Sequence, residues 1–243
     1  LLALPAFRRR VSERARKSIL AGEPTGRHGD VSTMEYPRKT KLRDKPWEAV
    51  RSIGRSFCYN AQEPPEAYLT GDQLTALVAD VVSKNGNVLI NVGPKLDGTI
   101  PREQREPLLA LARWLRTHGS AIYGTRPWHV AEGTTEDGIP LRYTTRADAL
   151  FVIVFERPSR LSLIIPHLDY RKVPSSLSRS DRGSVLSASI LGLDEPVEWR
   201  RLDDGVEIFL PGSLVHSGPF VVVFRWHHES EAPPPIQVYT DVI

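Results

Sequence analysis

A single glutamate, Glu35, stands between Met34 and Tyr36 in the stretch HGDVSTMEYP, residues 28–37. A lone glutamate on a loop is most often a solvated surface acid. A carboxyl group can also transfer protons as a general acid or base, usually together with a second carboxyl group in a different environment. The residue type alone leaves both interpretations of Glu35 open.

Other residues with reactive side chains give weaker signals. The single cysteine, Cys58, excludes an intrachain disulfide and a multi-cysteine metal site, and no base that would activate it is evident. His227 and His228 are adjacent at the end of a predicted strand, so their side chains should point to opposite faces. We therefore predict no metal site and no cofactor.

Four further acids have structural interpretations. We expect Asp30 and Asp97 to cap turns and Asp80 to be solvated, because it lies opposite the apolar face of a predicted helix. Glu48 has two interpretations: it supports the residues of a functional site from behind, or it forms a salt bridge at a strand end.

The bulk composition is that of an ordinary soluble protein of 243 residues, with 40% hydrophobic and 25% charged residues. A net charge of +3 gives little support for a nucleic-acid partner, and no apolar run reaches the roughly 18 residues that span a membrane. We predict neither partner. The basic opening segment has its apolar part before the Arg8–Arg10 cluster, the wrong order for a secretory signal; a transit peptide and a basic surface segment remain as alternatives.

The elements that must position these residues change type near residue 125. Before it, one apolar face recurs with helical spacing and is followed, after Asn85-Gly86, by a buried strand over 88–92. The residues of that face are Leu74, Leu77, Val78, Val81 and Val82. A second helix is predicted between Pro101 and Gly119, kinked or delayed by Pro107. A helix that leads into a buried strand is typical of a parallel α/β sheet or barrel.

From about Trp128 the pattern becomes antiparallel. Asp203-Asp204-Gly205 predicts a hairpin turn, and about seven short strands predict a β-sandwich. The predicted strands are LRYTTR, ALFVIVFE, RLSLIIPHL, VLSASILG, VEWRRL, VEIFLP and FVVVFRW. Residues 229–243 form a Pro-rich tail.

Four phrases occur in one order: HGDVSTMEY, PWEAVRSIGRSFCYN, LVADVVSKNGNVLINVGPKLDGTIP and SAIYGTRPW. Together they resemble the C-terminal half of the family 29 glycoside hydrolases, the α-L-fucosidases, from about Gly26 to Trp128 and more loosely beyond. The resemblance implies the last units of a (β/α)8-like barrel over 26–124 and an antiparallel β-sandwich over 125–228. Residues 1–25 match poorly and are interpreted as an atypical basic segment of foreign origin.

The resemblance also implies an activity, the retaining hydrolysis of α-L-fucosides on fucosylated glycans, by two carboxyl groups about 5 Å apart. Glu35 matches the acid/base of the bacterial members. Phe57 matches the aromatic residue that packs against the C5 methyl group of fucose. Trp47, in the phrase PWE, is predicted to contact substrate, with a core position as the alternative.

The chain departs from the family pattern at several points. No WND-like phrase supplies the nucleophilic aspartate, and no NDR segment precedes Glu35, so we predict no nucleophile in this chain. Cys58 replaces the usual glycine, and Pro46 and Val50 replace a lysine and a cysteine. We expect a truncated chain, and the alternative function is an inactive fragment or a carbohydrate-binding remnant. Location, cytoplasmic or secreted, and oligomeric state stay open.

Overall fold

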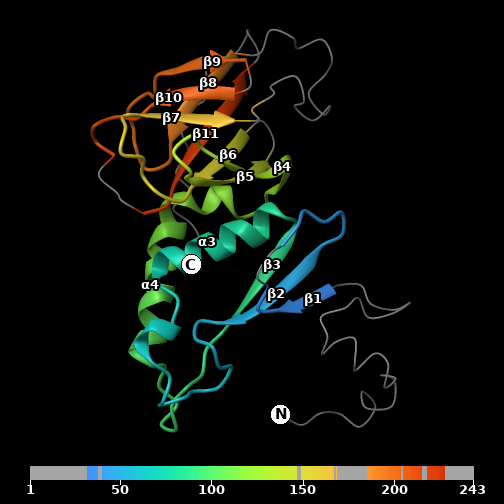
Figure 1. Ribbon diagram of the computed structural model, residues 1–243, viewed down its shortest axis with the longest axis vertical. Helices are drawn as coiled ribbons and strands as arrows, with labels where there is room; N and C mark the ends of the chain where they lie inside the picture. The colour runs from blue at the N-terminus through green and yellow to red at the C-terminus, as the bar shows by residue number, and fades with distance from the viewer. Residues whose placement is uncertain are drawn as a thin grey trace.

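The computed structural model describes residues 32–37, 40–146, 149–166, 168, 185–203, 205–214 and 218–227. The two antiparallel sheets lie at one end of the molecule, and the small parallel sheet and two helices lie side by side at the other (Figure 1). The change from parallel to antiparallel pairing falls near residue 125, as the sequence predicts.

The parallel sheet has three strands in the order β1-β2-β3: β1 is Ser32–Glu35, β2 is Trp47–Ser52 and β3 is Gly86–Asn91. Glu35 pairs with Val50 of β2, and Ser52 of β2 pairs with Asn91 of β3. The predicted strand over 88–92 corresponds to β3. Because the strands run the same way, their carboxyl ends meet at one edge of the sheet.

Helix α3, Gly71–Ser83, connects β2 to β3 and confirms the predicted helix. It begins with a capping box: Gln73 N–H donates to the Thr70 hydroxyl at 3.2 Å, and Thr70 N–H donates to Gln73 Oε1 at 3.0 Å. Past its end, Asn85 adopts a left-handed φ of 68°. Val81 packs with Trp47 and Ala49 of the sheet, which fixes α3 on one face of it.

Helix α4, Arg102–His118, begins five residues before Pro107, so the predicted delay is wrong. Pro107 lies in the second turn, where it removes only one backbone hydrogen bond, the one to the Glu103 carbonyl. Short 3-10 turns lie at Pro65–Ala67 before α3 and at Gly119–Ala121 after α4.

The antiparallel part forms a five-stranded sheet, β4-β5-β6-β11-β8, and a three-stranded sheet, β7-β10-β9. All seven predicted strands are confirmed, and the two-residue connection from β9 to β10 confirms the hairpin. Strand β4 was not predicted. The bounds are β4 Arg126–Thr134, β5 Pro140–Arg146, β6 Ala149–Val154, β7 Ser162–Pro166, β8 Val185–Ile190, β9 Trp199–Leu202, β10 Gly205–Phe209 and β11 Phe220–His227.

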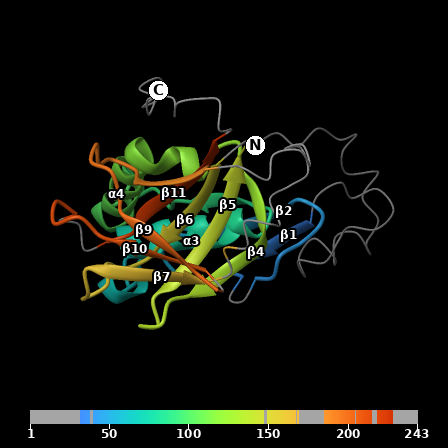
Figure 2. The ribbon, with the colours of Figure 1, turned by 90° about the horizontal axis from the view of Figure 1, so that it is seen from above.

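The two antiparallel sheets share one core, which confirms the β-sandwich. Val152 on β6 faces Ile165 and Ile208 of the smaller sheet, while its neighbours Phe151 and Ile153 face the helices. Every residue of β6 is buried for this reason. The larger sheet therefore lies between the smaller sheet and the helices (Figure 1). Seen from above, strands of this sheet cross over α3 (Figure 2).

Candidate functional site

Glu35 is the last residue of β1 and lies exposed at the carboxyl edge of the parallel sheet. Side chains alternate along a strand, so Glu35 points away from the face that Met34, Trp47 and Ala49 present to α3. Leu89 of β3 shares the Glu35 face and is 46% exposed, since no described helix covers this side of the sheet. Ligands of parallel α/β sheets bind outside this carboxyl edge.

Phe57 comes from the loop after β2 and lies beside the residue that follows Glu35. The rings of Phe57 and Tyr36 meet edge to face, with centroids 5.2 Å apart and an interplanar angle of 67°. Asn91 Nδ2, at the end of β3, donates to the Phe57 carbonyl at 2.6 Å. The structure therefore brings the ends of all three strands together around Phe57.

The loop over 53–69 is tied down on both sides of Phe57. Arg55 N–H donates to the Glu63 carboxylate, and Leu69 N–H donates to the Ile53 carbonyl at 2.9 Å. A side chain at Gly93 would meet the backbone nitrogen of Tyr59 at 2.3 Å, so only glycine allows this close approach of the β3 end. Cys58 is exposed in the same loop.

Gly93 is itself held from α4. Its N–H donates at 2.8 Å to Oε1 of Gln104, a side chain that is 1% exposed. A buried amide with this bond fixes the end of β3 against the first turn of the helix. The α4 helix thus positions the strand end that holds Phe57.

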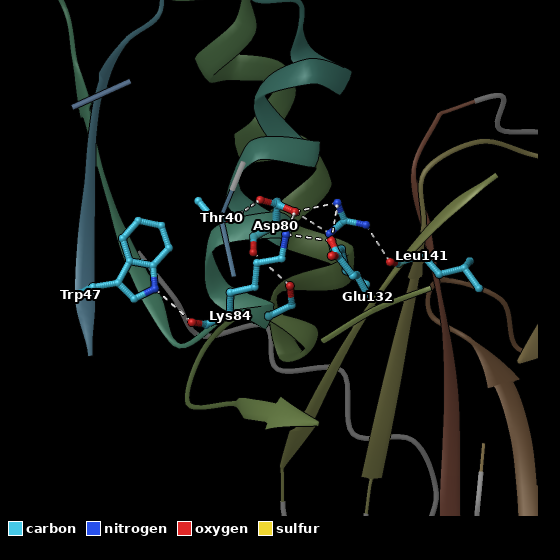
Figure 3. A network of polar contacts seen from close by, with 8 residues as sticks. Thr40, Trp47, Asp80, Lys84, Glu132 and Leu141 are labelled. Atoms are coloured by element: carbon cyan, nitrogen blue, oxygen red, sulfur yellow. Dashed lines mark hydrogen bonds and ion pairs between the residues drawn. The ribbon is translucent and has the colours of Figure 1, made fainter. Parts of the chain in front are cut away.

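Trp47 lies at the opposite end of its strand from the site edge. It is fully buried against Ala49 and Val81, and its indole N–H donates to the Lys84 carbonyl at 3.0 Å (Figure 3). With no exposed surface, Trp47 has no ring face to offer a sugar. The predicted substrate contact is therefore wrong in this structure, and the core alternative holds.

The predicted solvation of Asp80 is also wrong. Its carboxylate accepts bonds from Lys84 Nζ at 2.7 Å, Thr40 Oγ1 at 2.6 Å and the Arg142 guanidinium at 2.6 Å, and Glu132 joins Lys84 at 2.8 Å (Figure 3). Burial raises the pKa of Asp80, but these hydrogen bonds and the Arg142 charge outweigh it, so the pKa lies below its ordinary value. The network joins α3 to β4 and β5.

The turn acid behaves as predicted. Asp97 Oδ1 accepts from Thr99 Oγ1 at 2.7 Å and Thr99 N–H at 2.9 Å, and these bonds lower the pKa of Asp97. Glu48 lies on the Glu35 face and forms no ion pair with another described residue. Asp30, the Arg8–Arg10 cluster and His228 lie outside the described residues.

Within the part of the chain that the structure describes, no three side chains of the metal-binding types gather at one point. A groove of about 780 Å³ runs along β3 at the opposite end from Glu35, between α3 and α4. Its lining includes Val78, Val82, Val88, Ile90, Leu111 and Leu115. This groove is therefore separate from the Glu35 edge.

Comparison with known proteins decides the family. The α-L-fucosidase family model matches residues 8–120. An α-L-fucosidase of Branchiostoma floridae is 30% identical over 174 residues, which are 70% of this chain and 35% of that protein. A Thermotoga maritima α-fucosidase, solved with a mechanism-based inhibitor, is 37% identical at a TM-score of 0.71, over 82% of this chain and 43% of that one.

The chain belongs to the α-L-fucosidase family. A second Thermotoga maritima α-fucosidase structure, in complex with fucose, is 36% identical at a TM-score of 0.69. The chain spans about a third of the length of the curated relatives and less than half of these structures. The family match begins at residue 8, so the predicted start near Gly26 is wrong, and residues 8–25 are not foreign to the family.

Sequence reasoning missed three residues that shape the site edge: Tyr36, Asn91 and Gln104. Their roles depend on contacts with Phe57 and Gly93 that are distant in sequence. Of the three, only Asn91 had a signal in the sequence. It stands near the end of a predicted buried strand, and ligands bind outside the carboxyl ends of such strands.

Proposed function

We propose that this chain carries the acid/base part of a retaining α-L-fucosidase site. Glu35 protonates the leaving oxygen and then activates water, and Phe57 forms the apolar wall for the C5 methyl group of fucose. The observation that carries the proposal is the position of Glu35 at the carboxyl edge of a parallel sheet, next to the Phe57 loop, in a chain of this family.

We further propose that β1, β2 and β3 are the last strands of a (β/α)8-like barrel that ends near residue 124, and that the C-terminal β-sandwich follows from about residue 125. Among the described strands, β1 and β3 each have one neighbour, so each leaves a hydrogen-bonding edge open. The groove beside β3 supports the proposal, since a further βα unit would cover its apolar residues, such as Val88 and Ile90. The nucleophile, in this proposal, comes from outside the 243 residues.

None of the described helices is long and apolar enough to cross a membrane.

The substrate that we propose is a fucosylated glycan. The deciding experiment measures hydrolysis of an aryl α-L-fucoside by the natural polypeptide that carries this sequence, with and without Glu35→Gln. We expect strong loss of turnover in the variant and partial rescue by azide, which replaces the water that Glu35 activates. Unchanged turnover would reject the role of Glu35.

A second candidate function is a carbohydrate-binding remnant without catalysis. The lack of a WND-like phrase in these 243 residues favours it, because a covalent mechanism needs a nucleophilic carboxylate as well as an acid/base. The natural polypeptide that carries this sequence tests it, by fucose titration and an aryl fucoside assay on the same sample. Binding of fucose without hydrolysis supports the remnant, and hydrolysis rejects it.

A further inference from the structure

Tyr36 directly follows Glu35 and has an unusual backbone. Its φ is +46°, and among the described residues only Asn85 shares a positive φ without being glycine. Asparagine tolerates this left-handed region through its short polar side chain, whereas a bulky aromatic residue is strained there. Such strain persists only where surrounding contacts impose it, and it concentrates at functional sites.

Four contacts hold Tyr36 in this conformation. Its N–H donates to the Val50 carbonyl at 3.0 Å, which extends the pairing of β1 with β2 by one residue. Its hydroxyl donates to the Arg55 carbonyl at 3.0 Å, and its ring meets the Phe57 ring. The Arg51 guanidinium lies 5.7 Å from the ring centroid, within the range of a cation–π contact.

These contacts reach both sides of the proposed site. Glu35 is fixed through the backbone by the β1–β2 pairing before it and by the turn at Tyr36 after it. Phe57 is fixed through its ring by Tyr36 and through the carbonyl of Arg55, two residues upstream. Tyr36 is thus the one described residue whose side chain contacts the Phe57 loop and whose backbone continues directly from Glu35.

We propose that Tyr36 is a positioning residue, which sets the Glu35 carboxyl group at a fixed place relative to the wall formed by Phe57. The inference rests on the proposed function. A proton donor acts only within hydrogen-bond reach of the leaving oxygen, while Phe57 sets where the sugar lies. Tyr36 contacts neither the sugar nor the reacting atoms in this role; it couples two groups that do.

The test compares two substrates whose dependence on the acid differs. A fucosyl disaccharide needs protonation of its poor leaving group, whereas a dinitrophenyl fucoside leaves without it. The variants are made in the natural polypeptide that carries this sequence. Asparagine in Tyr36→Asn tolerates the positive φ but removes the ring, and Tyr36→Phe removes only the hydroxyl. Phe209→Asn, at an exposed aromatic position of the sandwich, is the matched control.

We expect Tyr36→Asn to lower kcat/KM for the disaccharide at least tenfold more than for the dinitrophenyl fucoside, and Tyr36→Phe to do so about two- to fivefold. Phe209→Asn should leave the ratio of the kcat/KM values for the two substrates unchanged. A general loss of structure lowers kcat/KM equally for both substrates. If folded Tyr36→Asn leaves the ratio of the two kcat/KM values unchanged, the inference is overturned. If Tyr36→Asn does not fold, an unchanged ratio in Tyr36→Phe overturns it.

Glu35→Gln, measured alongside, separates this inference from the proposed function. If Glu35→Gln leaves the substrate ratio unchanged, the acid/base assignment fails and the inference fails with it. If Glu35→Gln changes the ratio strongly and the Tyr36 variants do not, only the inference about Tyr36 fails.

Discussion

The edge that carries Glu35 and the junction between α3 and the sandwich both hold carboxylates, but in opposite surroundings. Asp80 at the junction accepts bonds from Lys84, Thr40 and Arg142, and the Lys84 side chain is 4% exposed. Glu35 is exposed, and the contacts around it are made by the neighbouring backbone and by aromatic rings.

The difference separates a structural acid from an acid free to react. A carboxylate that already accepts three bonds from two cations and a hydroxyl stays ionised and is tied to its partners. Glu35 is fixed by its backbone, and its carboxyl group has no hydrogen bond or ion pair with the residues that the structure describes, so it can exchange a proton with a ligand. The comparison favours a structural role for Asp80 and the proposed acid/base role for Glu35, and substitutions can test each role.

The largest effect is expected from Glu35→Gln, which should lower turnover and leave stability nearly unchanged. Because general acid–base catalysis contributes roughly 10²–10⁴-fold, turnover of a fucosyl disaccharide should fall by about that factor. Denaturant unfolding should show a change below about 0.5 kcal/mol, since the side chain is exposed. A large loss of stability would mean that Glu35 belongs with Asp80 as a structural acid.

Asp80→Asn should reverse this pattern. Removing one member of a buried ion pair lowers the free energy of unfolding by about 3–5 kcal/mol. Because Glu132 remains as a partner for Lys84 and Arg142, we expect a loss at the lower end, roughly 3 kcal/mol. The matched control is Glu132→Gln, whose side chain is 54% exposed and whose loss should cost less than about 1 kcal/mol. Equal unfolding midpoints for the two variants would contradict the network.

Phe57→Ala sharpens the site half of the comparison. A contact with one methyl group is worth about 1–3 kcal/mol, so kcat/KM for an α-L-fucoside should fall roughly 10–200-fold. The same variant should lose its preference for the fucoside over an α-L-galactoside, whose C5 substituent is a hydroxymethyl group. If the preference survives the substitution, Phe57 is a core aromatic and not a sugar wall.

The sequence predicted most elements but few of the contacts between them. Strands such as β6 follow from apolar runs, and α3 follows from its apolar spacing and its end at Asn85. Strand β4 was missed because Pro127 and Gly133 interrupt its pattern, and its pairing with β5 is irregular.

The errors at single residues have a common physical cause. Asp80 lies opposite the main apolar face of α3, but Arg142, 62 residues away, reaches it from the sandwich. Trp47 shares a phrase with site residues, yet strand alternation turns it toward α3. The φ of Tyr36 has no sequence signature, because tertiary contacts impose it. The proposed roles of Glu35 and Phe57 came from the family phrases alone.

The smallest expected effect is the acid dependence of the junction. Because the folded pKa of Asp80 lies below its ordinary value of 3.8, its bonds contribute stability that is fully present above about pH 4 and lost as the pH falls through the folded pKa. Urea unfolding between pH 6 and pH 2.5 should therefore show a shallower acid loss in Asp80→Asn than in the parent. Asp97→Asn is the control, since that acid also has a lowered pKa but sits exposed in a turn, outside the junction. A parallel pH profile for Asp80→Asn and the parent would show that Lys84 and Arg142 hold α3 to the sandwich without help from the charge of Asp80, leaving their bonds to Glu132 as the ionic link.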